Sequence, residues 1–249
     1  MSIRADTRSS QKRNLGKARP RASVLHLLIC CFAIQAASPS LFGQAGSPPA
    51  AKPRIALGVL VDTSGHQEKV IQLEREALDL LARRLDGVVT ESFVFSYADK
   101  VNLLQDWSPI ENGLGRVSTK VEPGPEDNTN VRTVLNDALN AALLKQESRS
   151  DVNLNVLVVI GEGNSRGSAT KYPQIKKLAK SMRVQCFALL VANHALMAGK
   201  VRQFGFYPND LARSTQGNGY DVGASQKQLD KAVNDVVKRI IRHAQANKN

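Results

Sequence analysis

Hydrophobic and polar positions alternate with two different periods along residues 55–249, and these periods predict alternating strands and helices. Three runs are apolar at nearly every position and rich in β-branched residues. They are RIALGVLVD (54–62), NLNVLVVIG (153–161) and VQCFALLVA (184–192). Such runs indicate strands that are buried on both faces. The stretch TESFVFSYADKVNLLQDW (90–107) contains two shorter runs, which predict a hairpin that turns at residues 98–100.

Helical spacing of apolar residues separates these strands. Val70, Leu73 and Ala77 begin the first such pattern, in which apolar residues recur every three or four positions. The predicted helices cover residues 70–85, 133–146, 172–182 and 225–245, and residues 210–223 predict a helix end, a turn and a short strand. Ser225 is a candidate N-cap for the last helix. The fold class that follows is α/β, with a doubly wound, mostly parallel central sheet, one antiparallel edge strand and helices on both faces.

The first 45 residues have a different pattern and predict a secretory signal peptide. A basic segment with seven Lys or Arg residues and one Asp is followed by the apolar run 24–37 and then by small residues. Cleavage is expected after Ala45, with a site near Ala37 as the alternative. Fourteen apolar residues are fewer than the ~20 that cross a bilayer, so membrane attachment is expected only through an uncleaved signal segment. We therefore predict a secreted, periplasmic or cell-envelope protein, with a Pro-rich linker at 46–54 and one domain at 55–249.

Charge and composition narrow the classes of partner. The formal net charge of +12 comes from 34 basic and 22 acidic residues. Residues 1–45 hold seven of these bases and one of these acids, so the remainder has a net charge of about +6. Aromatic residues make up 5% of the chain, and no basic cluster is interleaved with them. Nucleic acid is therefore not expected as a partner. Cys186, the one cysteine of the remainder, lies in an apolar run and is expected to be buried.

Polar residues follow two of the buried strands and predict a site at one edge of the sheet. Asp62-Thr63-Ser64-Gly65-His66 follows the first strand, and Gly161-Glu162-Gly163 follows the strand at 153–161. In an open α/β sheet, ligands bind outside the carboxyl ends of the strands. We therefore expect these segments to share one edge, with Asp62 and Ser64 facing Thr133 and Glu162 across a shallow cleft.

Four landmarks in order resemble the von Willebrand factor type A (VWA) domain, of the secreted bacterial type called VWFA-related. Asp62-Thr63-Ser64-Gly65-His66 is similar to the Asp-x-Ser-x-Ser motif of that family, with His66 in the place of the last serine. VRTVLNDAL (131–139) is similar to its Gly-Gly-Thr-x-Leu-x-x-Ala-Leu, without the two glycines. Gly161-Glu162-Gly163 stands where the family has Thr-Asp-Gly, and LARSTQGNGYDVG (211–223) resembles its Leu-Ala-x-x-Thr-Gly-Gly segment and the strand after it.

The resemblance implies a metal-ion-dependent adhesion site that binds another protein and catalyses no reaction. The residues it assigns to the metal site are Asp62, Ser64, His66, Thr133 and Glu162. Mg²⁺ or Mn²⁺ would be held by oxygen ligands there, and the partner would complete the shell. An imidazole is a poor ligand for Mg²⁺ and a better one for Zn²⁺, Mn²⁺ or Ni²⁺. His66 therefore leaves three outcomes open, namely Mg²⁺ or Mn²⁺ binding, a softer metal bound through the imidazole, or a degenerate site without a tightly bound metal.

The alternative function is an α/β enzyme or a nucleotide-binding domain that uses the loop Gly161–Gly167. Glycines after a buried strand let backbone amides approach a phosphate, although Glu162 would repel one. Two enzyme classes fit the Asp62 segment less well. An aspartic protease needs Asp-Thr-Gly twice, and a haloacid dehalogenase needs a second Asp where this chain has Ser64.

Overall fold

A computed structural model describes residues 53–124, 133–149, 151–192 and 206–246. All of them belong to the unit of chain that begins at residue 49. The predicted signal peptide, its cleavage sites and residues 46–52 of the predicted linker lie outside the described residues. Within the described residues, no helix is both long enough and apolar enough to cross a membrane.

Six strands form one sheet in the order β3-β2-β1-β5-β7-β8. Their bounds are β1 Ile55–Asp62, β2 Glu91–Tyr97, β3 Val101–Ser108, β5 Leu154–Gly161, β7 Gln185–Val191 and β8 Asn218–Gly223. β1, β2, β5, β7 and β8 pair in parallel, and β3 pairs antiparallel with β2 at the edge. The predicted hairpin and the predicted mostly parallel sheet are both confirmed.

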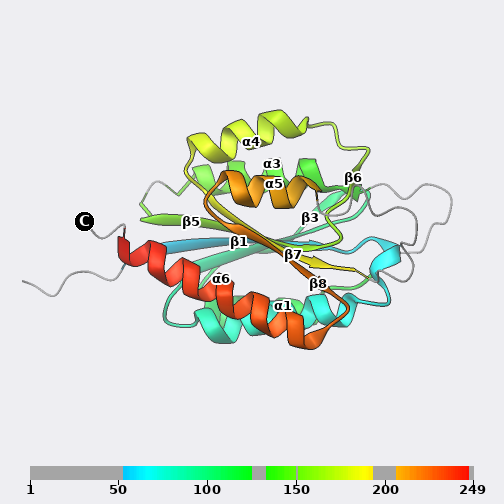
Figure 1. The fold of residues 1–249 in the computed structure, drawn as a ribbon, viewed down its shortest axis with the longest axis horizontal. Helices are drawn as coiled ribbons and strands as arrows, with labels where there is room; N and C mark the ends of the chain where they lie inside the picture. Colours follow the sequence, from blue (N-terminus) through cyan, green and yellow to red (C-terminus); the bar gives the residue numbers. More distant parts are fainter. Residues whose placement is uncertain (1–52, 125–132, 150, 193–205, 247–249) are drawn as a thin grey trace, which may run out of the picture. The chain divides into compact units, whose positions relative to one another are not determined.

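Helices cover both faces of this sheet (Figure 1). One face is covered by α1 Ile71–Leu85, α2 Ile110–Ser118 and α6 Gln226–Ala246, and the other by α3 Leu135–Glu147, α4 Tyr172–Ser181 and α5 Phe206–Ser214. Alternate residues of β1 enter the two apolar cores, with Leu57 and Val59 in the first and Leu60 in the second. All eight residues of β1 are buried, which confirms a strand covered on both faces.

Two smaller sequence predictions are also confirmed, and one helix was missed. Cys186 is free and buried within β7. The amide of Gln228 donates to Ser225 Oγ at 3.4 Å, so Ser225 caps α6. Helix α2 was not predicted, because its sequence IENGLGRVS contains two glycines, which are poor helix formers. It is helical here because Ile110, Leu114 and Val117 are buried against the first core.

The register of the sheet brings the predicted site together. Asp62 pairs with Tyr97 of β2, and Val61 pairs with Ile160 of β5, so β1 and β5 end side by side. A short 3₁₀ helix, η1 Gly65–Gln67, follows β1. The two-residue strand β4 Thr133–Val134 pairs with β6 Ser165–Arg166, which lies in the loop after β5. The helix predicted from Thr133 therefore begins at Leu135, and Thr133 belongs to β4 instead.

Candidate functional site

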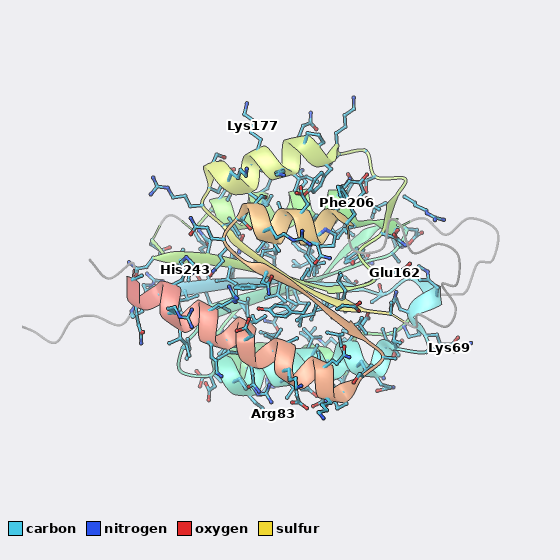
Figure 2. The ribbon with its side chains drawn as sticks, in the orientation of Figure 1. Lys69, Arg83, Glu162, Lys177, Phe206 and His243 are labelled. Atoms are coloured by element: carbon cyan, nitrogen blue, oxygen red, sulfur yellow. The ribbon has the colours of Figure 1, made fainter. Side chains whose placement is uncertain are left out.

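Four of the five predicted site residues are joined by direct contacts at the carboxyl end of the sheet. Asp62 ends β1, Ser64 and His66 follow it, and Glu162 follows β5. Figure 2 shows Glu162 at this end of the sheet and His243 at the opposite end. Thr133 is buried on β4, and its hydroxyl has no hydrogen-bond partner in the described part of the chain. We call this end of the sheet, with these five residues, the rim.

The rim is more closed than the shallow cleft that the sequence suggested. Asp62, Ser64, Thr133 and Glu162 are each at most 3% exposed. The His66 side chain is 28% exposed and is the one of the five with substantial contact to solvent. An imidazole on the outer side of a buried polar cluster therefore replaces an open cleft.

Hydrogen bonds connect these side chains in one network, which runs from the end of β1 to the loop after β5. The amide and the hydroxyl of Ser64 both donate to Asp62 Oδ1, at 3.0 and 2.5 Å. His66 Nε2 lies 3.2 Å from Ser64 Oγ and forms an ion pair with Glu162 Oε2. The other oxygen of Glu162 accepts from the side-chain amide of Asn164, a residue that the sequence analysis did not single out.

The partners of His66 determine which of its nitrogens carries hydrogen. The single hydroxyl hydrogen of Ser64 is used on Asp62, so Ser64 Oγ acts as an acceptor toward the imidazole. The carboxylate of Glu162 has lone pairs only. Both neighbours of Nε2 are thus acceptors, and Nε2 must carry a hydrogen and donate it. Its lone pair is therefore not available to a metal ion in this arrangement.

Burial and neighbouring groups act in opposite directions on the pKa of Asp62 and on that of His66. Burial raises the pKa of Asp62 to about 6, although the hydrogen bonds from Ser64 and the nearby His66 lower it in part. For His66, burial alone would lower the pKa, but Glu162 and Asp62 outweigh it and raise the pKa above its ordinary value of 6.5. The two carboxylates therefore make the imidazole of His66 hold its proton more readily than an ordinary histidine does.

Solved structures with the same arrangement of strands and helices include two bacterial proteins. BatB from Bacteroides thetaiotaomicron, a conserved hypothetical protein, has a TM-score of 0.59 and 14% identity over 77% of this chain and 99% of BatB. The PilB minor pilin from Streptococcus sanguinis has a TM-score of 0.56 and 12% identity over 79% of this chain and 63% of PilB. The VWA domain of SpRpn10 has a TM-score of 0.50 and 13% identity over 72% of this chain and 94% of that domain.

This chain has the VWA fold. The resemblance inferred from the sequence motifs is confirmed at the level of fold, and at these identities the likeness to solved structures extends no further. No protein-family model and no curated protein match the sequence.

Two buried polar residues beside the VWA rim were missed from the sequence. Glu74 of α1 is fully buried, and both of its carboxyl oxygens lack a partner among the described residues. Burial, with a smaller effect of Asp62, raises its pKa well above the ordinary range. Tyr97 is also fully buried, and burial and the neighbouring carboxyl groups raise its pKa. The signal for Glu74 was its spacing, three residues after Ile71 and four before Leu78, on the apolar stripe of α1.

The arrangement of the rim does not fit an octahedral Mg²⁺ ion. Mg²⁺ requires oxygen ligands at about 2.0–2.1 Å. Asp62 Oδ2 and Thr133 Oγ1 are buried without partners in the described residues and would suit a cation. Ser64 Oγ and Glu162, however, already contact the imidazole N–H of His66. In the described part of the chain, no three His, Cys, Asp or Glu side chains are grouped to hold a metal ion.

The glycine-rich loop offers less to a phosphate than its sequence suggested. Gly161, Gly163 and Gly167 all have positive φ, so the loop does use glycine conformations. However, α4 begins only at Tyr172, and the amides of the two residues before Lys171 donate to the Asp137 carboxylate. The N–H groups of residues 169 and 170, just before α4, are therefore already used by an anion of the protein itself and are not available to a phosphate.

Proposed function

We propose that this chain is a protein-binding module of the cell envelope or exterior that binds its partner through the VWA rim and catalyses no reaction. The observation that carries this proposal is the buried charged chain of Asp62, His66 and Glu162 at the carboxyl ends of β1 and β5. Burying charged groups costs free energy even when they are paired, and the packing of the two apolar cores does not require them. The same edge is where open α/β sheets bind their ligands.

The likeness to PilB supports a role in the envelope or outside the cell, because PilB is a minor pilin. This chain spans 63% of PilB, so the comparison concerns one domain of that protein. The predicted signal peptide supports the same location. The absence of catalysis rests on the site itself, since the one solvent-contacting imidazole of the rim is held by Ser64 and Glu162 rather than facing a nucleophile.

Charge reversal at the rim tests the proposed partner surface. Arg166 is exposed on β6, beside the Glu162 loop, and Arg242 is exposed near His243 at the opposite end of the sheet. With the protein as bait in envelope extracts of its source cells, we expect one partner to be retained by the wild type and by Arg242→Glu. The Arg166→Glu variant should retain it about tenfold less, because a repulsive charge in an interface weakens association. A partner lost with Arg242→Glu and kept with Arg166→Glu would place the binding surface elsewhere.

Export is tested by the N-terminus of the protein in its cells. N-terminal sequencing of the envelope fraction or the medium should give a sequence that starts at Gly46, or near Ser38 if the alternative cleavage site is used. The physical reason is that the apolar run 24–37 has the length of a signal-peptide core. A protein that starts at Met1 or Ser2 and stays in the cytoplasm would contradict this prediction.

A further inference from the structure

We propose that the imidazole of His66 takes the place of the divalent cation at the VWA rim, so that the rim works without a metal ion. The inference deepens the proposed function, since it concerns the same rim. Its claim about metal binding is separate, however, and is tested with metal ions alone, without any partner.

The contacts of His66 join two separate segments of the rim. Its Nε2–H faces Ser64 Oγ, from the segment after β1, and Glu162 Oε2, from the loop after β5. One positively polarised hydrogen thus links two oxygens from two separate segments, as a metal ion shared between them would. The side-chain amide of Asn164 donates to the other oxygen of Glu162. Both oxygens of this carboxylate therefore have a partner, which fixes its orientation toward the imidazole.

The same contacts exclude a metal ion while His66 stays in place. Because Nε2 donates to two acceptors, it has no lone pair for Zn²⁺ or Mn²⁺, whatever the charge on the ring. The one lone pair of a neutral ring is then on Nδ1, which is buried. Ser64 Oγ is occupied by its bonds to Asp62 and to the imidazole. Among the described residues, two further buried oxygens at the rim lack partners, Asp62 Oδ2 and Thr133 Oγ1. Mg²⁺ needs six ligands, so water would have to supply others, which requires a rim open to solvent. The side chains of Asp62 and Thr133 are instead buried.

A smaller residue at position 66 should therefore reopen the metal site. His66→Ser removes the imidazole that contacts Ser64 and Glu162 and supplies a hydroxyl, the group that the family's motif has at this position. His66→Asn is the second variant, because its amide oxygen is a hard ligand and its size is closer to that of histidine. The matched control is His243→Ser at the opposite end of the sheet. His243 is also held by two side chains, with Nδ1 2.8 Å from Gln185 Nε2 and Nε2 3.1 Å from Gln216 Oε1.

The experiment is calorimetric titration of the four proteins with MgCl₂, MnCl₂ and ZnCl₂ alone, with thermal unfolding in each salt. We expect the wild type and His243→Ser to bind Mg²⁺ and Mn²⁺ at least tenfold more weakly than His66→Ser or His66→Asn. The melting temperature should rise with Mg²⁺ only in the two His66 variants. Adding Thr133→Val to His66→Ser should abolish the gain, because it removes a hydroxyl ligand with little change of shape.

Three results would overturn the inference. Binding of Mg²⁺ or Mn²⁺ by the wild type as tight as by the variants would show that His66 does not exclude the ion. Zn²⁺ binding by the wild type that is lost in His66→Ser would make His66 a ligand instead. No binding by any protein would show that something other than His66 keeps metal out. If the variants do not fold, the wild-type titration still decides, since tight Mg²⁺ binding contradicts the inference. None of these results depends on whether a partner binds the rim.

Discussion

Replacing Gly161 with alanine should lower the free energy of unfolding by about 2 to 6 kcal/mol. Gly161 has a φ of +135°, which a residue with a side chain rarely adopts, and such strain costs about 1–3 kcal/mol. A Cβ at this position would also meet the Cβ of Asp62, and overpacking of this kind costs a further 1–3 kcal/mol, roughly. The measurement is chemical denaturation of the wild type and Gly161→Ala at the same pH.

Gly115→Ala is the matched control for this substitution. Gly115 lies on the exposed side of α2, and an added Cβ would meet nothing within 4 Å. Alanine is favoured over glycine in a helix by about 1 kcal/mol, so this variant should be slightly more stable than the wild type. Equal stabilities of Gly161→Ala and Gly115→Ala would contradict the close approach of β5 to Asp62.

Raising the pH from 4 to 6 should cost the wild type about 2 kcal/mol of stability through Asp62 alone, out of about 3 kcal/mol over the whole titration. The pKa of Asp62 is about 6 in the folded protein, against an ordinary value of 3.8. The folded state therefore holds this proton more tightly, and stability falls as the proton is released between these two values. Each unit of difference corresponds to about 1.4 kcal/mol. Glu74, whose pKa is also raised, adds to the decline above pH 4.5.

Two asparagine variants isolate this effect. Asp62→Asn cannot release a proton, so its stability should decline less between pH 4 and 6, by about the 2 kcal/mol assigned to Asp62 in this window. Asp137→Asn should keep the full wild-type decline. Burial acts to raise the pKa of Asp137, but the hydrogen bonds from Thr170 and Ala169 outweigh it and lower the pKa, which places its contribution below this window. His66 titrates above pH 6.5 and does not contribute to the decline. Denaturant unfolding at pH 4, 5 and 6 checks this, and identical profiles for wild type and Asp62→Asn would contradict a raised pKa of Asp62.

The fold was predictable because its core strands have a distinctive hydrophobic pattern in the sequence. β1, β5 and β7 are apolar runs without alternation, and only a sheet covered on both faces buries such runs completely. Helix α2 and the two-residue strands β4 and β6 were not predictable in the same way. Their residues have weak local preferences, and tertiary contacts such as the pairing of Thr133 with Arg166 decide their structure.

For Asp62, Ser64, His66 and Glu162, the sequence predicted which rim residues meet but not how they meet. The ends of parallel strands meet at one edge, so Asp62 and Glu162 were expected to be neighbours. The orientation of the His66 ring could not be predicted in this way, because it depends on the rotamer and on the hydrogen bonds of Ser64 and Glu162. Motif spacing therefore left three metal outcomes open. The burial of Glu74 had a signal in its helical spacing, but a carboxyl group on an apolar stripe is normally expected to be exposed.

The most direct test of a rim in which His66 stands in for the cation is a crystal of the wild-type protein soaked in MnCl₂. Anomalous difference maps locate Mn²⁺ independently of the refined side chains. We expect no anomalous peak at the rim and clear density for the imidazole between Ser64 Oγ and Glu162, as the contacts of His66 indicate. An anomalous peak bonded to Ser64 and Thr133, with the imidazole turned away, would contradict the account.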